Sequence, residues 1–442
     1  MAIYKFYMPG GKYPGQYLPN HWATDYNPTL GELLDDGYYQ NRSASGATYV
    51  MTNGVKLIIS GSNLSYSQGA PAGGTITALK LVDAKTGSVI QSVTGLSWSG
   101  KSFTSAVNAG DPYFTESVAL SGNDTLYGSA GGDELWGNGG NDILNGGTGG
   151  DNLVGGRGKD TYDGGTSAGS IDQLDFEDTY YDAMGAHGVT VNMSTGKAID
   201  PWGNAETFKN IERIKGTQFV DKITGSLNDD QFRPLGGKDI VDGGSGKDTI
   251  RYDRDTQHNG NAGVSVDLAA GYGIDGFGAT DTLRNIENVV GTRYADKITG
   301  NAGANALKAD RGNDVLKGNE GTDRLFGEAG ADKLYGGSGN DAFVYESLSH
   351  STTAASGRDT IFDLVTGDKI DLSIIDANTG LSGNQAFNFI GTKAFSGQPG
   401  ELRYVKQTAG TYISADVNGD RNADFAIQLD DAMSLTKGYF VL

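Results

Sequence analysis

The chain has 442 residues, a net charge of -20, 70 glycines and no cysteine. Such an acidic protein is not expected to bind nucleic acid or a simple anionic membrane surface, because the phosphates of either would be repelled. The lack of cysteine excludes disulfides, thiolate catalysis and cysteine zinc sites. No run of 18 apolar residues is present to span a membrane, and the length indicates about three structural units.

Residues 1–115 are predicted to form a small β-domain with a role in interaction or assembly. Segments 47–52, 55–60, 74–83 and 88–95 read as strands, and Asn53-Gly54 suits a hairpin turn. Tyrosines are dense here and accompany Trp22, so they offer a contact surface for proteins or sugars; the alternative is that they fill a small β core. The first residues show no basic start followed by an apolar core, so no Sec signal peptide is predicted.

Residues 116–165 carry an aspartate every nine residues within a glycine-rich frame. Glycine permits left-handed turns that curl backbone carbonyls around a cation, and aspartate adds a hard, charged oxygen that suits calcium. Two positions after each aspartate lies a large apolar residue, which predicts a very short strand with one buried side chain. A single repeat is too small to bury that side chain, so neighbouring repeats must stack into a parallel β-roll. The predicted calcium ligands are Asp124, Asp133, Asp142, Asp151 and Asp160.

The pattern recurs twice, each time after a spacer. Residues 166–251 hold a spacer and a second array with Asp221, Asp230, Asp239 and Asp248 as predicted ligands. Residues 252–345 hold a third array with predicted ligands Asp296, Asp314, Asp323, Asp332 and Asp341, whereas Asn305 stands where an aspartate is expected and predicts weak or no binding. The spacers at 189–225 and 264–300 align without a gap at an offset of 75, which indicates duplication. They are read as further strands; a helix is the alternative for 207–214 and 282–289.

Residues 346–442 follow the third array and are predicted to form a β-rich region. Within it, Asp416, Asn418, Asp420 and Asp424 space their oxygens like a calcium loop, although Gly419 is not at the EF-hand position. The alternative interpretation is a polar hairpin turn.

The repeats resemble those of the RTX family of secreted bacterial proteins, and residues 343–442 resemble the tails of serralysin-type metalloproteases. The resemblance implies export through the type I secretion machinery of a Gram-negative cell, using an uncleaved C-terminal signal. Serralysin-type tails usually end in an acidic residue and three apolar ones; this chain ends in Gly438, Tyr439, Phe440, Val441 and Leu442, so the apolar end is kept and the acid is missing.

Motifs for catalysis are weak. A match to the P-loop pattern at 95–102 lies in a segment too short for a nucleotide domain, and the G-x-S-x-G match at 165–169 lacks a strand before it and a helix after it. There is no H-E-x-x-H, and the four histidines are far apart. The predicted protein is therefore all-β, extracellular or bound to the cell surface, calcium-dependent and non-enzymatic. Its predicted role is structural or adhesive, through self-assembly or through a cell-surface polysaccharide or protein; the alternatives are a polysaccharide-acting enzyme or a carbohydrate-binding module.

Overall fold

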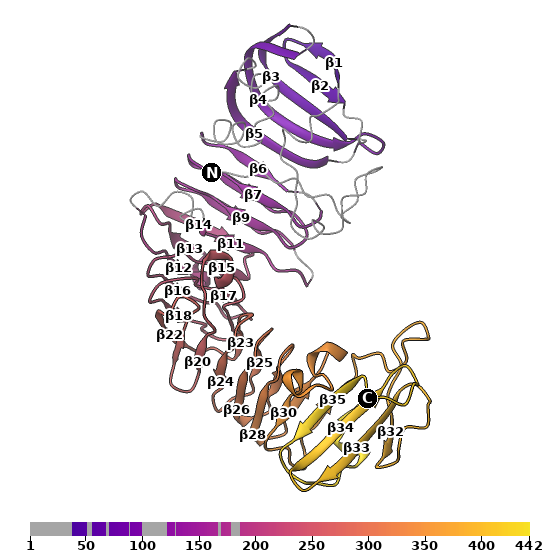
Figure 1. Cartoon of the computed structure of the whole chain (residues 1–442). Coiled ribbons are helices and arrows are strands. Elements are labelled where there is room, and N and C mark those ends of the chain that lie inside the picture. Colours follow the sequence, from indigo (N-terminus) through magenta and orange to yellow (C-terminus); the bar gives the residue numbers. More distant parts are fainter. Residues whose placement is uncertain are drawn as a thin grey trace. The chain divides into compact units, whose positions relative to one another are not determined.

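The computed structural model describes residues 38–50, 55–67, 70–87, 89–99, 122–128, 130–166, 169–177 and 186–442. The chain divides into two compact units, residues 1–223 and 224–442, which are described here one at a time (Figure 1). Across the described ranges the regular structure is strand, interrupted only by short 3-10 turns. The predicted all-β class is confirmed. Within the same ranges, no helix is both long and apolar enough to cross a membrane.

The first unit begins with an antiparallel meander in which each strand pairs with the next. Its strands are β1 (Tyr38–Ser43), β2 (Gly46–Val50), β3 (Val55–Ser67), β4 (Ala70–Asp83) and β5 (Val89–Ser99). Alternate residues are buried, among them Tyr49, Leu57 and Ile59, as period-2 alternation requires. Strand β5 pairs with β6 (Thr125–Tyr127), so the meander continues directly into the repeats. Tyr4, Tyr7 and Trp22 lie outside the described residues.

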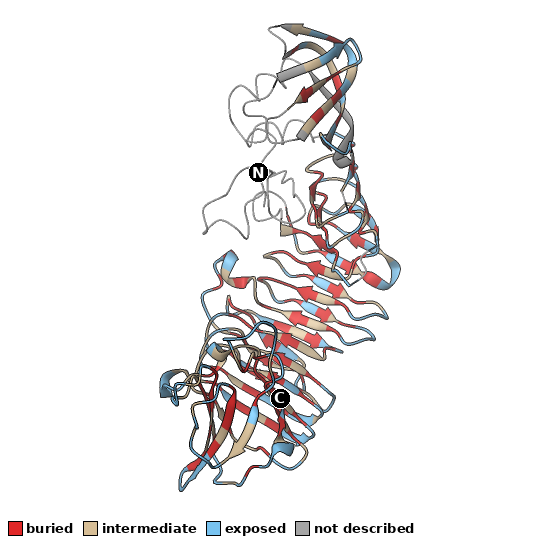
Figure 2. Cartoon of the chain, turned by 90° about the vertical axis from the view of Figure 1, so that its right-hand side faces the viewer, coloured by how far each residue is buried: buried red, intermediate tan, exposed pale blue. Residues whose placement is uncertain are grey.

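The repeats of the first unit form two parallel sheets that share one core. One sheet contains β6, β8 (Ile143–Asn145), β10 (Thr161–Asp163) and β14 (Ala205–Lys209). The other contains β7 (Glu134–Trp136), β9 (Asn152–Val154), β11 (Gln173–Asp175) and β15 (Arg213–Lys215). Successive nonapeptides alternate between sheets, so strand neighbours such as Leu126 and Leu144 are one full coil apart. Central residues of the strands, such as Leu135 and Tyr162, are buried (Figure 2). The parallel β-roll is thereby confirmed.

Each spacer adds a three-stranded antiparallel meander to the roll. In the first unit β12 (Thr190–Asn192), β13 (Lys197–Ile199) and β14 pair in sequence order. In the second unit β20 (Ser265–Asp267), β21 (Tyr272–Ile274) and β22 (Thr280–Arg284) do the same. The alternative of helices at 207–214 and 282–289 is not observed, because these segments begin within β14 and β22. Strand β16 (Lys222–Thr224) lies at the boundary between the units.

The second unit carries the longer roll. In one sheet, β18 (Ile240–Asp242) pairs with β22 of the spacer. The same sheet continues from β20 through β24 (Lys297–Thr299), β26 (Val315–Gly321), β28 (Lys333–Gly339) and β30 (Thr360–Ile361) to β35 (Phe425–Leu429). The other runs through β17 (Gln231–Arg233), β19 (Thr249–Arg251), β23 (Asn288–Val290), β25 (Ala306–Lys308), β27 (Arg324–Phe326), β29 (Ala342–Val344), β31 (Lys369–Asp371) and β36 (Phe440–Val441).

The C-terminal region closes this roll with a different kind of sheet. Strands β33 (Glu401–Gln407), β34 (Gly410–Asp416) and β35 are antiparallel, and β32 (Asn388–Gly391) pairs in parallel with β33. The core beneath them contains Leu402, Ile413 and Phe425, each with 0% of its surface exposed. The ring of Tyr345, just after β29, meets Phe425 edge to face at 5.4 Å, so the closing sheet and the roll share one apolar interior.

Candidate metal-binding turns

The aspartates predicted as ligands lie in the turns that connect the two sheets, and they form a hydrogen-bonded ladder. The backbone N–H of Asp124 donates to Asp142 Oδ1 at 2.7 Å, and that of Asp142 donates to Asp160 Oδ1 at 2.7 Å. The same contact joins Asp133 to Asp151 and, in the second unit, Asp314 to Asp332. Each partner is one coil away, because two nonapeptides complete a coil. In each of these contacts Oδ1 of the carboxylate accepts the hydrogen bond, and Oδ2 takes no part in the ladder.

The second oxygen of most of these carboxylates is buried without a hydrogen-bond partner. This holds for Oδ2 of Asp124, Asp142, Asp151, Asp160, Asp248, Asp314, Asp323, Asp332 and Asp341. Leaving a buried carboxylate oxygen unpaired costs on the order of 1–3 kcal/mol or more. A recurrent cost of this kind, at the same atom of successive repeats, is removed if the atom binds a cation.

The backbone around these atoms explains why they are left open. The residue four positions before the aspartate adopts a positive φ, as in Asn138 at 71° before Asp142 and Gly147 at 108° before Asp151. Such a φ suits glycine and asparagine. We call these the open turns; their aspartates and preceding positive-φ residues are Asp142 (Asn138), Asp151 (Gly147), Asp160 (Gly156), Asp248 (Gly244), Asp314 (Asp310), Asp323 (Asn319), Asp332 (Glu328) and Asp341 (Gly337).

A backbone carbonyl lies beside the open oxygen in the turns of Asp142, Asp151, Asp248 and Asp323. A Cβ placed on Gly137 would crowd Asp142 Oδ2 and would lie 2.7 Å from the carbonyl oxygen of Gly155, one coil on. Gly146 stands in the same relation to Asp151 Oδ2 and the carbonyl oxygen of Gly164. The absence of a side chain therefore lets carboxylate and carbonyl oxygens converge. An all-oxygen ligand set of this kind is what calcium prefers, so the residues present fit that ion.

The electrostatics of the open turns also favour a cation. Burial, reinforced by the neighbouring carboxylates of Asp160 and Asp124, raises the pKa of Asp142 to about 8. Burial and the charges of Asp332 and Asp296 raise the pKa of Asp314 to about 8 in the same way. A carboxylate in this environment is costly to ionise alone, and a divalent cation offsets that cost while displacing the proton.

Three turns at predicted sites are built differently. Thr217 donates its N–H to Asp221 Oδ2 at 2.8 Å and its hydroxyl to Asp221 Oδ1 at 2.9 Å. Thr292 N–H donates to Asp296 Oδ2 at 2.7 Å, and Ser226 N–H donates to Asp230 Oδ2 at 2.5 Å. We call these, together with the Asn301–Asn305 turn, the closed turns.

The side chains of the closed turns are already satisfied by the protein, so these turns lack the feature that supports ligation in the open turns. Thr217, Ser226, Thr292 and Asn301 do not adopt a positive φ, so their N–H groups point at the side chain four residues on. The oxygens of Asp221 and Asp296 accept protein hydrogen bonds instead of remaining open, with Oδ1 of each also accepting from Val189 and Val264. We therefore do not count Asp221, Asp230 and Asp296 among the proposed ligands. Gly-Thr precedes Asp221 and Asp296, and Gly-Ser precedes Asp230. Gly-Asn occurs in both kinds of turn, at Asn301 and at Asn138, so residue type alone does not separate them.

The remaining predicted residues are placed as follows. Asp133 and Asp239 are buried in roll turns, and Asp239 N–H donates to Asp281 Oδ1 at 3.1 Å. In the C-terminal loop, Asp416 accepts the N–H groups of Gly419 and Arg421. Asp420 N–H donates to Asn418, and Asp424 accepts from Val417 N–H. These contacts are those of the polar turn considered as the alternative, and a metal there stays a prediction. Over the described residues, no three acidic or histidine side chains gather as a metal site.

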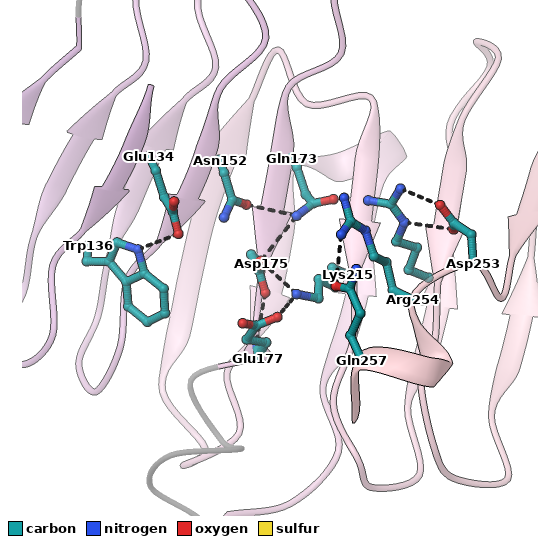
Figure 3. Close-up of polar contacts among 11 residues, drawn as sticks. Glu134, Trp136, Asn152, Gln173, Asp175, Glu177, Lys215, Asp253, Arg254 and Gln257 are labelled. Atoms are coloured by element: carbon teal, nitrogen blue, oxygen red, sulfur yellow. Dashed lines mark hydrogen bonds and ion pairs between the residues drawn. The ribbon is translucent and has the colours of Figure 1, made fainter. Parts of the chain in front are cut away.

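Sequence analysis missed a polar network on the outer face of the second sheet of the first unit (Figure 3). Gln173 Nε2 donates to Asn152 at 2.8 Å and to Asp175 at 3.1 Å, and Lys215 reaches Asp175 at 3.3 Å and also contacts Glu177. Figure 3 also shows Trp136 donating to Glu134, at 3.0 Å. Lys215 and Asp175 are 40 residues apart in the chain, so only the register of the strands reveals the pair. The network joins β9, β11 and β15 across their outer face.

The second unit carries a comparable network. Arg233 and Arg251 both pair with Asp253, at 3.1 Å and 3.0 Å. Burial opposes ionisation of Asp253, but hydrogen bonds and charge from the two arginines lower its pKa to about 2. In both networks carboxylates pair with neighbouring bases, so the networks tie strands together.

Comparison with known proteins gives one family match and several structural likenesses. Residues 117–441 match the family model described as Peptidase M10 serralysin C terminal. Solved structures that resemble the chain include the AlgE6R3 subunit of the Azotobacter vinelandii mannuronan C5-epimerase, 24% identical over 34% of this chain and 78% of that one, with a TM-score of 0.26. The AlgE6R2 subunit is 22% identical over 35% and 92%, at 0.27, and the extracellular lipase LipA of Serratia marcescens is 13% identical over 88% and 81%, at 0.22.

Proposed function

This chain belongs to the Peptidase M10 serralysin C-terminal family, and we propose that it is a secreted protein whose β-rolls fold on calcium outside the cell. The observation that carries the proposal is the repeated open turn, in which a buried Oδ2 has no partner. In the turns of Asp142, Asp151, Asp248 and Asp323 a backbone carbonyl lies beside that oxygen. Asp142, Asp151, Asp323 and their equivalents would supply charged oxygens, and the glycine carbonyls would supply neutral ones.

Calcium would act mainly on folding. The bound ion satisfies the open oxygens and screens the stacked carboxylates. At ten times its dissociation constant, an ion bound only by the folded state contributes roughly 1.4 kcal/mol per site. Extracellular modules bind calcium with constants of about 0.1–1 mM, so the sites would fill outside the cell and stay empty in a cytosol. The chain would then leave the cell unfolded, with residues 346–442 as its secretion signal and type I machinery as its route.

We further propose that the role is structural or adhesive and not catalytic. In support, the carboxylates of the open turns accept the backbone hydrogen bonds of the ladder. In the two polar networks, Asp175 pairs with Lys215 and Asp253 pairs with Arg233. Strand β5 pairs with β6, so the N-terminal sheet is built onto the roll as its direct extension. The roll would act as a stiff spacer, and the tyrosine-rich residues 1–115 would provide attachment or self-assembly.

Two experiments test these proposals separately. Circular dichroism of the full chain, in chelator and in millimolar calcium, tests folding, and an unchanged β signal would reject calcium-driven folding. Microscopy of the calcium-loaded protein and a cell-binding assay, each repeated without residues 1–115, test assembly and attachment. Retained assembly or attachment in the truncated chain would move the activity into the rolls or the C-terminal region. Turnover of a polysaccharide, lipid or casein by the purified protein would favour the enzyme alternative.

A further inference from the structure

The second spacer contains two buried carboxylates that belong to no nonapeptide turn. Asp255 opens the 3-10 turn η3 (Asp255–His258), and Asp275 follows β21; each has 0% of its surface exposed. Asp255 Oδ2 accepts the N–H of Gly276 at 2.9 Å. Asp275 Oδ1 accepts the N–H groups of Phe277 and Ala279 at 2.9 and 2.7 Å. The other oxygen of each side chain, Asp255 Oδ1 and Asp275 Oδ2, has no hydrogen-bond partner.

In the first spacer, both oxygens of the equivalent aspartate accept hydrogen bonds from the protein. Asp200, 75 residues before Asp275, accepts the N–H groups of Trp202 and Asn204 on Oδ1. Its Oδ2 accepts the side-chain amide of Asn204 at 2.9 Å. In the second spacer the residue equivalent to Asn204 is Ala279, whose side chain has no donor to offer. The second spacer therefore lacks the amide that satisfies this oxygen in the first.

The surroundings of the pair are acidic and closed. Asp281 Oδ2 accepts the hydroxyl of the fully buried Tyr252 at 3.0 Å, so this neighbour is already satisfied. Burial, with added repulsion from Asp275 and Asp281, raises the pKa of Asp255 to about 8. The carbonyl oxygen of Ala262 also lies close by, 3.4 Å from the position of a Cβ on Gly276.

We propose that Asp255 and Asp275 bind one calcium ion through Asp255 Oδ1 and Asp275 Oδ2. Two carboxylates match the charge of the ion, and backbone carbonyls and water would complete the six to eight oxygens that calcium takes. The ion does in the second spacer what the Asn204 amide does in the first. It also joins η3 to the turn after β21, two segments of the spacer that are otherwise held by the Asp255–Gly276 hydrogen bond and the Ala262–Gly276 backbone contact. This site is additional to the open turns.

The test counts bound ions on the full-length protein at saturating calcium, by equilibrium dialysis and elemental analysis. Ala279→Asn restores the amide of the first spacer and is expected to lower the count by one ion per chain while the fold is kept. Asp255→Asn should lose the same ion. The matched control is Asp200→Asn in the first spacer, which should leave the count unchanged. Crystals of the calcium-loaded wild type should show an anomalous peak between Asp255 and Asp275.

The outcomes separate this inference from the function on which it rests. A wild type that binds no calcium at all would reject both. This site alone would be rejected if the wild type binds several ions, both Ala279→Asn and Asp255→Asn bind the same number, and the crystals show no peak at the pair. In that case a proton shared between Asp255 and Asp275 would satisfy the two oxygens. The peak in wild-type crystals decides the matter even if a variant does not fold.

Discussion

The open turns and the closed turns hold the same side chain at the same place in the roll, and they satisfy it by different means. In the open turn of Asp142, the ladder uses Oδ1 and the backbone turns its N–H away from Oδ2. In the closed turn of Asp221, Thr217 supplies both an N–H and a hydroxyl. We therefore expect closed turns to form before any ion binds and open turns to require an ion. The comparison teaches that the aspartate alone does not distinguish the two turns; the φ of the residue four positions earlier does.

Removing calcium should give the largest effect. With chelator, the arrays of open turns should lose their β signal in circular dichroism, because each empty turn leaves an unpaired buried oxygen and repelling carboxylates. Adding millimolar calcium should restore the signal. A melting temperature that does not change between the two conditions would show that the open turns are satisfied without an ion.

Substituting the aspartate should separate the two kinds of turn. Asp142→Asn keeps Oδ1 for the Asp124 N–H but removes a charged ligand, so calcium affinity and cooperativity should fall while stability at saturating calcium changes little. Asp124→Asn, at the edge of the array, should have a smaller effect. Asp221→Asn should cost about 1–3 kcal/mol with or without calcium, because an amide N–H group would face one of its donors. Melting curves at low and saturating calcium measure this; identical calcium dependence for Asp142→Asn and Asp221→Asn would contradict the distinction.

Adding a methyl group to an open turn should block its site. Gly137→Ala places a Cβ against Asp142 Oδ2 and the Gly155 carbonyl, so calcium titration by calorimetry should show weaker binding in the first array. Gly122→Ala is the matched control, because no atom lies within 4 Å of its Cβ. Equal affinities for the two variants would mean that the carboxylate and carbonyl do not share an ion.

The smallest effect should be that of pH without calcium. The pKa of Asp142 and of Asp314 is raised to about 8, well above the ordinary value of an unfolded aspartate. Their protonation therefore stabilises the metal-free fold fully below pH 4, and this stabilisation is lost as pH rises towards 8. In chelator, the β signal should be stronger at pH 5 than at pH 8. In limiting calcium the order should reverse, because binding displaces those protons. A chelated protein equally folded at both pH values would argue against raised pKa values in the turns.

The sequence predicted the roll well because its nine-residue period directly encodes which residues stack. Leu126, Leu144 and Tyr162 are buried as their spacing requires. The sequence does not separate the open turns from the closed ones, since Asp221 and Asp142 look alike until the φ of the residue four positions earlier is known. Asp255 and Asp275 carried no periodic signal, because only folding brings these segments of the spacer together. The ion pair between Lys215 and Asp175 could not be predicted for the same reason.

The C-terminal strands have a consequence for how copies of this protein can associate. A stack of parallel strands exposes unpaired N–H and C=O groups at its last strand, and such an edge is a template for another chain. Here one sheet of the second unit ends in β36, which has only two residues, and the other passes through β35 into an antiparallel sheet. A short terminal strand and a change of pairing direction are both ways to prevent edge-to-edge growth. We therefore do not expect copies of this protein to associate by continuing the roll of the second unit beyond its C-terminal strands.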